Sequence, residues 1–485
     1  MKHSFSLKDK STFQNRVIST ISKIAEENNY KTYLVGGYVR DQFLGIESND
    51  IDVIVIGDAI KFAKLSAERL NTELSAVYKK FGTALIKLPF ESAGPNSNIL
   101  KIEFASARKE SYRKNSRKPI VEFSDLEDDL SRRDFTVNTL AISLNSDDFS
   151  ELIDRFNGLK DLKHKVLRTP LSPLKTFNDD PLRMLRAIRF ASQLNFEVEE
   201  DTFNAINKMR SRLRIEKSSP VSQERITDEF LKILSTRKPS IGLSLLQKSG
   251  LMKIIFQEVY ELEGVEQRRD YHHKDVFYHT LQVVDNISLK TDNLWLRFAA
   301  LMHDIAKPAT KKFVEGTGWT FHGHEETGAK WQKNIFKKLK LPLDKLNYVE
   351  KLVKLHLRPI ALANEGVTDS AIRRLIFETG DYINDLMTLC RADITSKDPK
   401  KVKEYTFNFD RVEKRIKEVE ERDRIRNFQS PVRGEEIMKI CNIPQSKQVG
   451  IIKSKIEEAI LEGIIPNDYE AALEYLNKVK DELLI

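Results

Sequence analysis

The stretch YLVGGYVRDQFLGIESNDIDVIVIGD, residues 33–58, constrains the fold of this chain more than any other. Its pattern predicts a short strand, a diglycine turn, a helix over 38–44 and a second strand over 51–56. Glycine lets the backbone approach a ligand closely, and a turn that leads into a helix N-terminus points free N–H groups at an anion. Gly36 and Gly37 are therefore expected to lie against a phosphate group.

Two aspartates stand where the second predicted strand begins. Because side chains alternate along a strand, Asp50 and Asp52 are expected to face the same side. Mg²⁺ is commonly held by one or two carboxylates while substrate phosphates complete its shell. Alone, such a pair is more often a solvated strand end, but beside the diglycine turn it favours a magnesium site.

A third acidic residue lies in a predicted strand over 100–104. Glu103 has an apolar residue on either side, so its carboxylate is expected to point away from them. The pattern leaves two interpretations open. Glu103 is either an exposed acid at a sheet edge or a third carboxylate beside Asp50 and Asp52.

The stretch DDPLRMLRAIRF, residues 179–190, predicts a helix with a proline in its first turn. Asp180 and Arg183 are three residues apart and share a helix face, and two further arginines continue the row. The ordinary interpretation is a surface helix with salt bridges. The alternative is a recognition surface, because a carboxylate beside a planar guanidinium offers the acceptors and donors that match base edges.

In this order, these stretches resemble the motifs of class II tRNA nucleotidyltransferases and bacterial poly(A) polymerases, within the DNA polymerase β superfamily. GGYVRD followed by DID resembles the first motif, and RRDFTVN at 132–138 resembles the second, with Thr139 in place of the usual alanine. The segments 151–168, 179–190 and 221–234 resemble the third, fourth and fifth motifs of the family. The resemblance implies an α+β fold: a small N-terminal sheet of the polymerase β type with helices, then an all-α neck, a second helical domain and a helical tail.

The resemblance also implies roles for particular residues. Asp50 and Asp52, assisted by Glu103, would be catalytic and hold Mg²⁺. Asp180 and Arg183 would pair with the base of CTP or ATP in place of a nucleic-acid template. The residues expected to bind the nucleotide are Gly36, Gly37, Arg40, Arg133, Asp134, Asp180, Arg183, Arg186 and Arg189.

The implied activity is transfer of CMP, CMP and AMP from CTP and ATP to the 3′ end of tRNA. A basic segment at 108–123 without periodicity is expected to be a loop. It is either a disordered surface loop or the flexible loop that the family carries at this place, and the latter favours an enzyme that also adds the terminal A. Whether one enzyme adds all three nucleotides stays open.

A second pattern of metal-ligating residue types begins near residue 276. Of the nine histidines, seven fall between residues 272 and 356, and an adjacent His-Asp pair follows an apolar predicted helix. The order H…HD…H…H…D resembles HD-superfamily phosphohydrolases, which bind Mg²⁺ or a divalent transition metal. The resemblance implies that the core metal ligands are His279, His303, Asp304 and Asp393. It also implies that His324 and His356 are candidates for binding a second metal. Whether this domain hydrolyses phosphoesters or only shapes a tRNA-binding arm stays open.

Three rivals to CCA addition remain. A poly(A) polymerase shares the head motifs, but it usually lacks an HD domain. A metal-dependent phosphohydrolase with a vestigial head would make the HD site the main activity. A non-catalytic RNA-binding protein is disfavoured by the intact DID, RRD and DxxR patterns.

Length and composition set the remaining expectations. A chain of 485 residues is expected to hold several domains, here 1–150 (catalytic head), 151–255 (neck), 256–400 (HD domain) and 401–485 (helical tRNA-binding region). Two cysteines exclude a disulfide framework, and the charged start without an apolar core favours a cytoplasmic protein that does not contact a membrane. The formal net charge of +8 suits a polyanionic partner such as tRNA.

Overall fold

The computed structural model describes residues 12–90, 98–112, 119–214, 221–266, 275–365, 368–396, 398–423 and 428–483. The chain forms two compact units, and each is described by itself. Unit 1 comprises Met1–Ile233 with Leu245–Ile255, and unit 2 comprises Leu234–Ser244 with Phe256–Ile485. The predicted α+β class, with a sheet near the N-terminus and a helical remainder, is confirmed. The finer division into four domains stays a prediction.

Unit 1 contains a seven-stranded mixed sheet with the order β3-β4-β5-β2-β1-β8-β9. Strands β2 and β5 run parallel, and the other neighbouring pairs are antiparallel. The strands are β1 (Lys31–Val35), β2 (Asp50–Ile56), β3 (Leu74–Tyr78), β4 (Thr83–Phe90), β5 (Asn98–Ser106), β8 (Ala141–Ser143) and β9 (Leu152–Ile153). The predicted strand, turn, helix and strand of the opening motif correspond to β1, α2 (Gly36–Leu44) and β2.

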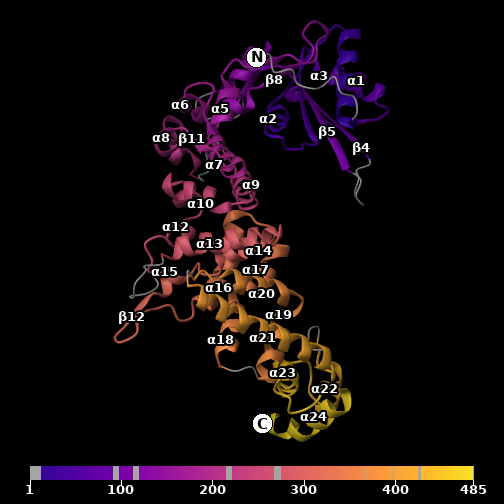
Figure 1. Ribbon diagram of the computed structural model, residues 1–485. Helices are drawn as coiled ribbons and strands as arrows, with labels where there is room; N and C mark the ends of the chain where they lie inside the picture. Colours follow the sequence, from indigo (N-terminus) through magenta and orange to yellow (C-terminus); the bar gives the residue numbers. More distant parts are fainter. Residues whose placement is uncertain are drawn as a thin grey trace. The chain divides into compact units, whose positions relative to one another are not determined.

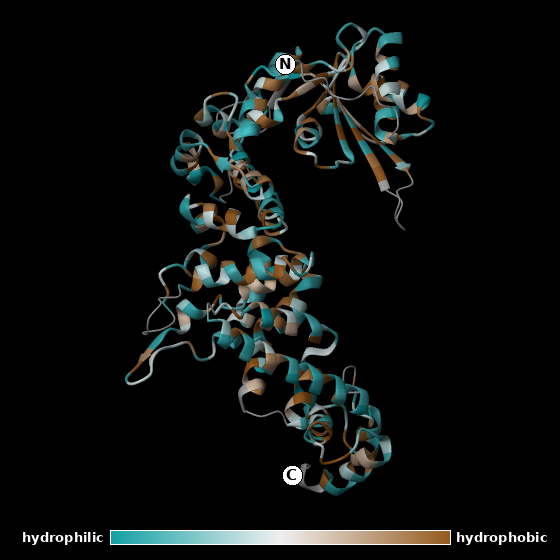
Figure 2. Cartoon of the chain, viewed as in Figure 1, coloured by the Kyte–Doolittle hydropathy of each residue, from teal (hydrophilic) through white to brown (hydrophobic). Residues whose placement is uncertain are grey.

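Helices α1 (Phe13–Glu27) and α3 (Ala59–Arg69) belong with this sheet (Figure 1). Apolar and polar residues alternate along β4 and β5, as the bands of colour in Figure 2 show, so one side of the strands meets the core. Phe62 of α3 and Phe104 of β5 are fully buried and meet edge to face at 5.6 Å. Beside this packing, β2 and β5 pair in register so that Asp52 lies opposite Glu103.

The segment 108–123 differs from the expected loop. Its described parts pair as an antiparallel two-stranded sheet, β6 (Arg108–Tyr112) and β7 (Pro119–Phe123), while residues 113–118 lie outside the described residues. Neither strand of this pair has the alternation of apolar and polar residues that is typical of a half-buried strand, so the sequence did not predict it. The hydrogen bonds between the two strands define this structure instead. Helix α4 (Leu126–Ser131) then begins at N-cap Asp125, whose carboxylate accepts a hydrogen bond from Asp128 N.

A set of helices follows the sheet in unit 1. Helix α7 carries the predicted recognition row and begins one residue after Pro181. The elements are α5 (Gly158–His164), β10 (Val166–Leu167), α6 (Pro173–Asp179), α7 (Leu182–Leu194), β11 (Glu197–Val198), α8 (Glu200–Met209), α9 (Gln223–Leu234) and α11 (Leu251–Ile255). Helix α10 (Pro239–Lys248) is divided between the units, and its part up to Ser244 belongs to unit 2. Short strands β10 and β11 pair in parallel and tie the start of this set to the end of α7.

Unit 2 is helical apart from the hairpin β12 (Lys312–Val314) and β13 (Gly318–Thr320) in its described part. Helix α14 is apolar except for Arg297 and is largely buried among its neighbours, as expected for a central helix. The helices are α12 (Gln257–Tyr260), α13 (Val276–Ser288), α14 (Leu294–Met302), α15 (Lys307–Thr310), α16 (His324–Leu339), α17 (Leu346–Leu355), α18 (Arg358–Glu365), α19 (Asp369–Thr379), α20 (Ile383–Ala392), α21 (Pro399–Asp423), α22 (Gly434–Cys441), α23 (Lys447–Glu462) and α24 (Tyr469–Leu483).

The later helices of unit 2 are joined by ion pairs as well as by apolar contacts. Asp369 of α19 accepts from Arg415 and Arg422 of α21, and Arg373 pairs with Asp423 at 2.7 Å. The long charged helix is thus docked on α19 along one side. No helix among the described residues is both long and apolar enough to span a bilayer.

Candidate active sites

The first candidate site lies where β2 and β5 run side by side in unit 1. Asp52 and Glu103 are register partners across these strands, and both line a pocket of about 1020 Å³. Asp50 pairs in register with Lys101, and its carboxylate lies 3.3 Å from the Lys101 ammonium. The three acids share one face of the sheet, as the alternation predicted, but Asp50 is 69% exposed and does not line the pocket.

The charge at this edge suits a cation. Partial burial raises the pKa of Asp52 to about 6, against the opposing charge of Arg133, and the neighbouring carboxylates Glu103 and Asp50 raise it further. A carboxylate that resists ionisation beside two others is stabilised when a cation neutralises the group. The acids therefore fit a hard metal ion, with the ligand types that Mg²⁺ takes.

The diglycine turn leaves room for the guanidinium of Arg133 beside these acids. Gly36 has φ +73°, and a Cβ added to it would lie 2.9 Å from Arg133 Nη1 and 3.0 Å from Asp52 Oδ2. The space that a side chain would fill is thus used by the approach of Arg133 to Asp52. At Gly37 an added Cβ would lie 3.6 Å from Arg40 Nη2, which is ordinary contact. Gly36 is the more constrained of the two.

Two arginines of the pocket are held by carboxylate and amide groups. Arg40 is buried, donates from Nη1 to Asn138 Oδ1 at 2.8 Å and pairs with Asp41 at 2.7 Å. Arg133 pairs with the buried Asp129 at 3.1 Å. Fixed guanidiniums of this kind are preorganised for phosphate oxygens, because less side-chain entropy is lost when they bind.

A chain of ion pairs connects the second motif to helix α7. Asp134 accepts from Arg186 at 2.6 Å and from the Asn138 side chain at 2.9 Å, and Arg189 pairs with Glu229 at 2.7 Å. Burial would raise the pKa of Asp134, yet Arg186 and Asn138 hold it well below its usual value. These charges are satisfied within the protein, so they stiffen the pocket wall.

The predicted base-facing pair lies in the same pocket. Asp180 Oδ1 accepts from Leu182 N at 3.0 Å, and Arg183 Nη2 donates to the Arg132 carbonyl at 2.7 Å. Both side chains line the pocket, so the structure brings them to the cavity that Asp52 and Glu103 also line.

Sequence reasoning missed part of this pocket. The additional lining residues include Tyr78, Lys80, Phe81, Arg108, Arg132, Gln193, Ser222 and Arg225. Tyr78, Lys80 and Phe81 come from the end of β3 and the turn after it, and no motif marks them. The others lie in or beside the segments 108–123, 132–138, 179–190 and 221–234, but the sequence does not show that these side chains line one pocket.

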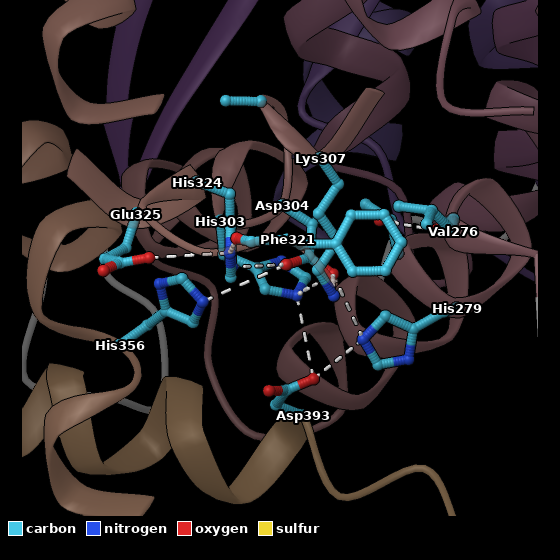
Figure 3. Close-up of polar contacts among 12 residues, drawn as sticks. Val276, His279, His303, Asp304, Lys307, Phe321, His324, Glu325, His356 and Asp393 are labelled. Atoms are coloured by element: carbon cyan, nitrogen blue, oxygen red, sulfur yellow. Dashed lines mark hydrogen bonds and ion pairs between the residues drawn. The ribbon is translucent and has the colours of Figure 1, made fainter. Parts of the chain in front are cut away.

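The second candidate site lies in unit 2 and is shown in Figure 3. Among the described residues, two groups have ligand atoms within 4.8 Å of one another: His279, His303 and Asp393, and Asp304, His324 and His356. They come from α13, the ends of α14, α17 and α20, and the start of α16. All six predicted ligands therefore converge, whereas the acids of the β2–β5 edge do not form such a group.

The imidazoles of this site are oriented alike. The Nδ1 atoms of His303, His324 and His356 each lie 2.7 Å from the carbonyl oxygen three residues earlier, and His279 Nδ1 lies 3.0 Å from Thr395 Oγ1. A carbonyl partner assigns the proton to Nδ1 and leaves Nε2 as the ligand atom. The buried Nε2 atoms of the first three have no hydrogen-bond partner among the described residues, as expected of atoms prepared for a metal.

Asp304 lies between the two groups. Its Oδ2 is 3.2 Å from His303 Nε2 and its Oδ1 is 3.3 Å from His324 Nε2, while Asp393 Oδ1 is 2.8 Å from His279 Nε2. This carboxylate thus touches both the predicted core set and the predicted second set. The donor set, imidazole nitrogens with carboxylate oxygens, fits divalent transition metals.

The electrostatics of this cluster agree with that fit. Burial lowers the pKa of His356 to about 3, so its imidazole is neutral and can donate a lone pair. Burial would raise the pKa of Asp304, yet His303 and Lys307 hold it well below its usual value. A metal would displace the protons that these groups otherwise share.

Other histidines and partners complete the comparison with the sequence. His322 is exposed and belongs to neither group, and the histidines at 272 and 273 lie outside the described residues. The sequence did not predict two residues that contact the ligands. Thr395 orients His279, and the ammonium of Lys307 lies 2.7 Å from Asp304. Lys307 is three residues after Asp304 on the turn into α15, a spacing that makes contact expected.

Three family models match consecutive parts of the chain. The poly(A) polymerase head domain matches residues 32–168, the probable RNA and SrmB-binding site of polymerase A matches 195–262, and the HD domain matches 276–398.

Similar proteins carry related names. An "A-adding tRNA nucleotidyltransferase" of Aquifex aeolicus is 35% identical over 65% of this chain and 35% of its own length. A "Multifunctional CCA protein" of Aliivibrio salmonicida is 31% identical over 74% of this chain and 84% of its own. A tRNA nucleotidyltransferase solved with a primer tRNA and an incoming ATP analogue has 26% identity and a TM-score of 0.55, over 81% of this chain and 98% of that one.

The chain spans only about a third of the length of the Aquifex relative. Its sheet, its arginine-rich pocket and its histidine cluster define a nucleotidyltransferase head followed by an HD domain. The chain belongs to the class II tRNA nucleotidyltransferase and poly(A) polymerase family, as the motifs predicted.

Proposed function

We propose that this protein is a CCA-adding tRNA nucleotidyltransferase that transfers CMP, CMP and AMP from CTP and ATP to the 3′ end of tRNA. One observation carries the proposal. A single pocket is lined by Asp52 and Glu103 of β2 and β5, by the turn at Gly36, and by several arginines whose positive charge is complementary to a triphosphate. Its volume of about 1020 Å³ is at the upper end of the range for small-molecule sites. The site of action would be the cytoplasm.

Asp50, Asp52 and Glu103 would hold Mg²⁺. When bound, the ion lowers the pKa of the RNA 3′-hydroxyl and neutralises the charge of the leaving pyrophosphate. In the reaction, the 3′-oxygen forms a bond to the α-phosphorus and the bond to the β-phosphate oxygen breaks. The hydroxyl proton is lost to solvent and pyrophosphate departs.

The remaining side chains bind and orient. Arg40 and Arg133, with the turn at Gly36 and Gly37, would hold the triphosphate, because the fixed guanidiniums line the pocket and helix α2 begins at Gly36 beside them. Asp180 and Arg183 would contact the base edge. Arg186 and Arg189 would extend this binding row, and their pairs with Asp134 and Glu229 would keep it rigid, which lets the protein replace a template.

The test is extension of tRNA lacking CCA, and of tRNA ending in CC, with CTP, ATP or both, resolved at single nucleotides. Two additions with CTP and three with both nucleotides are expected, and Asp52→Asn should extend neither tRNA. Extension of the CC-ending tRNA alone would identify an A-adding enzyme. A long ladder with ATP would identify a poly(A) polymerase.

A second activity is favoured by the histidine cluster. We infer that the HD centre, loaded with a divalent transition metal or Mg²⁺, hydrolyses a phosphomonoester or cyclic phosphodiester at an RNA end. Water oxygen would bond to phosphorus, and a ribose oxygen would leave with the proton. The test is conversion of an RNA 2′,3′-cyclic phosphate end to a phosphomonoester end, with metal content measured on the same sample. His303→Ala should lower both.

A further inference from the structure

The hairpin β12–β13 begins and ends at the HD centre. It follows α15, whose Lys307 pairs with Asp304 at 2.7 Å, and it leads to Phe321, whose carbonyl oxygen lies 2.7 Å from His324 Nδ1. Figure 3 shows Phe321 and Lys307 together beside Asp304, and Figure 1 shows the hairpin projecting from the helical body of unit 2. Anything that binds the hairpin is therefore led to the centre.

One side of the hairpin carries aromatic rings. Phe313 and Trp319 are register partners, and their rings meet edge to face with centroids 5.2 Å apart. Side chains two residues apart on a strand share a face, so Lys311 lies with Phe313, and Phe321 lies with Trp319. We call Lys311, Phe313, Trp319 and Phe321 the aromatic–lysine face.

Each of two lysines lies over a ring of this row. Lys311 Nζ is 4.4 Å from the centroid of Trp319, and Lys307 Nζ is 5.6 Å from that of Phe321. The series of rings and ammonium groups runs from the ligand Asp304 towards the tip of the hairpin. Phe313 and Trp319 are 45% and 37% exposed, so their rings are only partly used in packing.

The chemistry of this row selects its ligand. Unpaired nucleotides offer flat bases joined by anionic phosphates, and they are bound by aromatic platforms with cations between them. The segment 307–321 contains three lysines and one acid, Glu315, so its charge is complementary to such a chain. Aromatic and lysine side chains also bind anionic lipid surfaces, so vesicles are the competing ligand in the test below.

We propose that the aromatic–lysine face binds unpaired nucleotides of a single-stranded RNA end, with bases against Trp319 and Phe313 and the terminal phosphate directed into the HD centre. The role of the centre rests on the phosphohydrolase activity proposed above. The binding itself does not require that activity.

Binding is tested on the full chain with a five-nucleotide RNA bearing a 3′-terminal phosphate. The RNA should quench tryptophan fluorescence in the natural protein, and Trp319→Phe, which retains Trp295 and Trp331, should lose that quenching. Phe313→Ala should weaken binding about tenfold. The matched control is Phe407→Ala, which removes a 62% exposed ring from α21 and should change nothing. Equal effects of the two alanine variants, quenching by anionic vesicles but not by RNA, or no quenching, would overturn the proposal.

A second measurement separates binding from chemistry. Hydrolysis of the RNA end is compared with hydrolysis of a small aryl phosphate that has no base. Trp319→Ala and Phe313→Ala should raise KM for the RNA end about tenfold and leave the aryl substrate unaffected. An equal loss on both substrates would show that the hairpin only shapes the centre, against the proposal. If the natural protein hydrolyses neither substrate, the phosphohydrolase proposal fails, and the quenching measurement still decides the role of the hairpin.

Discussion

The two candidate sites of this protein hold acidic residues in opposite ways. On β2 and β5, two central strands, the carboxylates lie on one face of the sheet, and Asp50 is 69% exposed. In the HD centre, Asp304 is 2% exposed, and four imidazoles are oriented by hydrogen bonds to their Nδ1 atoms. The first site supplies only part of a coordination shell, whereas the second supplies most of one.

The difference fits the function proposed for each site. An open carboxylate pair leaves positions for substrate phosphates, so metal and nucleotide bind together and leave together. A buried cluster of nitrogen and oxygen ligands keeps its metal between turnovers, because the ligands are already in place. The following predictions test this contrast, beginning with the largest expected effect.

Removing one charge from the open site should abolish its chemistry alone. Asp52→Asn is expected to lower nucleotide addition about 10³-fold or more, because the cation and the developing charge lose their closest partner. Addition is measured in single-turnover assays with tRNA lacking CCA. Asp147→Asn, an exposed carboxylate outside the pocket, serves as control. Loss of metal from the HD centre in Asp52→Asn would contradict the independence of the two sites.

Metal retention should separate the sites next. After dialysis against metal-free buffer, we expect up to two divalent ions per chain to remain, one for each ligand group of the HD centre. His303→Ala should lose most of this content, since it removes a buried ligand, while nucleotide addition with supplied Mg²⁺ persists. Elemental analysis and the addition assay on one preparation measure both. A natural protein that retains no metal would refute the closed-site interpretation.

Selection of the nucleotide should depend on the helix α7 pair. Arg183→Ala is expected to reduce discrimination between CTP and ATP about tenfold or more, because a base-edge hydrogen bond contributes roughly 1–3 kcal/mol when its partner is left unpaired. The ratio of kcat/KM for the two nucleotides measures this. Arg155→Ala, an exposed arginine of unit 1, should leave the ratio unchanged. An equal fall for both nucleotides would assign Arg183 to phosphate binding instead.

The smallest expected effect is that of pH on the Mg²⁺ requirement for nucleotide addition. Since the pKa of Asp52 is raised to about 6, the carboxylate is ionised above that pH and increasingly protonated below it. A proton then competes with the cation, so the Mg²⁺ concentration for half-maximal addition should rise as pH falls from 7.5 to 5, about fivefold for the last unit. tRNA binding measured at each pH is the control. A constant Mg²⁺ requirement would show that Asp52 does not bind the ion.

Local motifs predicted the elements of the head well. The strand, turn and helix at Gly36 could be recognised because glycine and alternating apolar residues act over a few positions. Strand β3 and the paired arms β6 and β7 were not, since their stability comes from partners along the sheet rather than from their own pattern. Hydrophobic periodicity cannot predict strands whose bounds are set by pairing with a neighbouring strand.

The candidate sites show the same limit. The six HD ligands could be predicted because residue type and order define them, but the position of Asp304 between both groups could not. It depends on α14, α16 and α17 meeting in space. In the head, the row at Arg186 and Arg189 was predicted, but their partner Glu229 lies on α9, and no spacing connects it to them.

The turn at Gly36 also bears on how the sequence of this protein can vary. Every change of a glycine codon that alters the residue adds at least one carbon atom, and here that atom would meet Arg133 and Asp52 within about 3 Å. No amino acid available to a genome is smaller, so the position has no neutral neighbours in the genetic code. Lineages that keep this chemistry must keep this codon family, whereas the exposed surface of the same unit is open to drift.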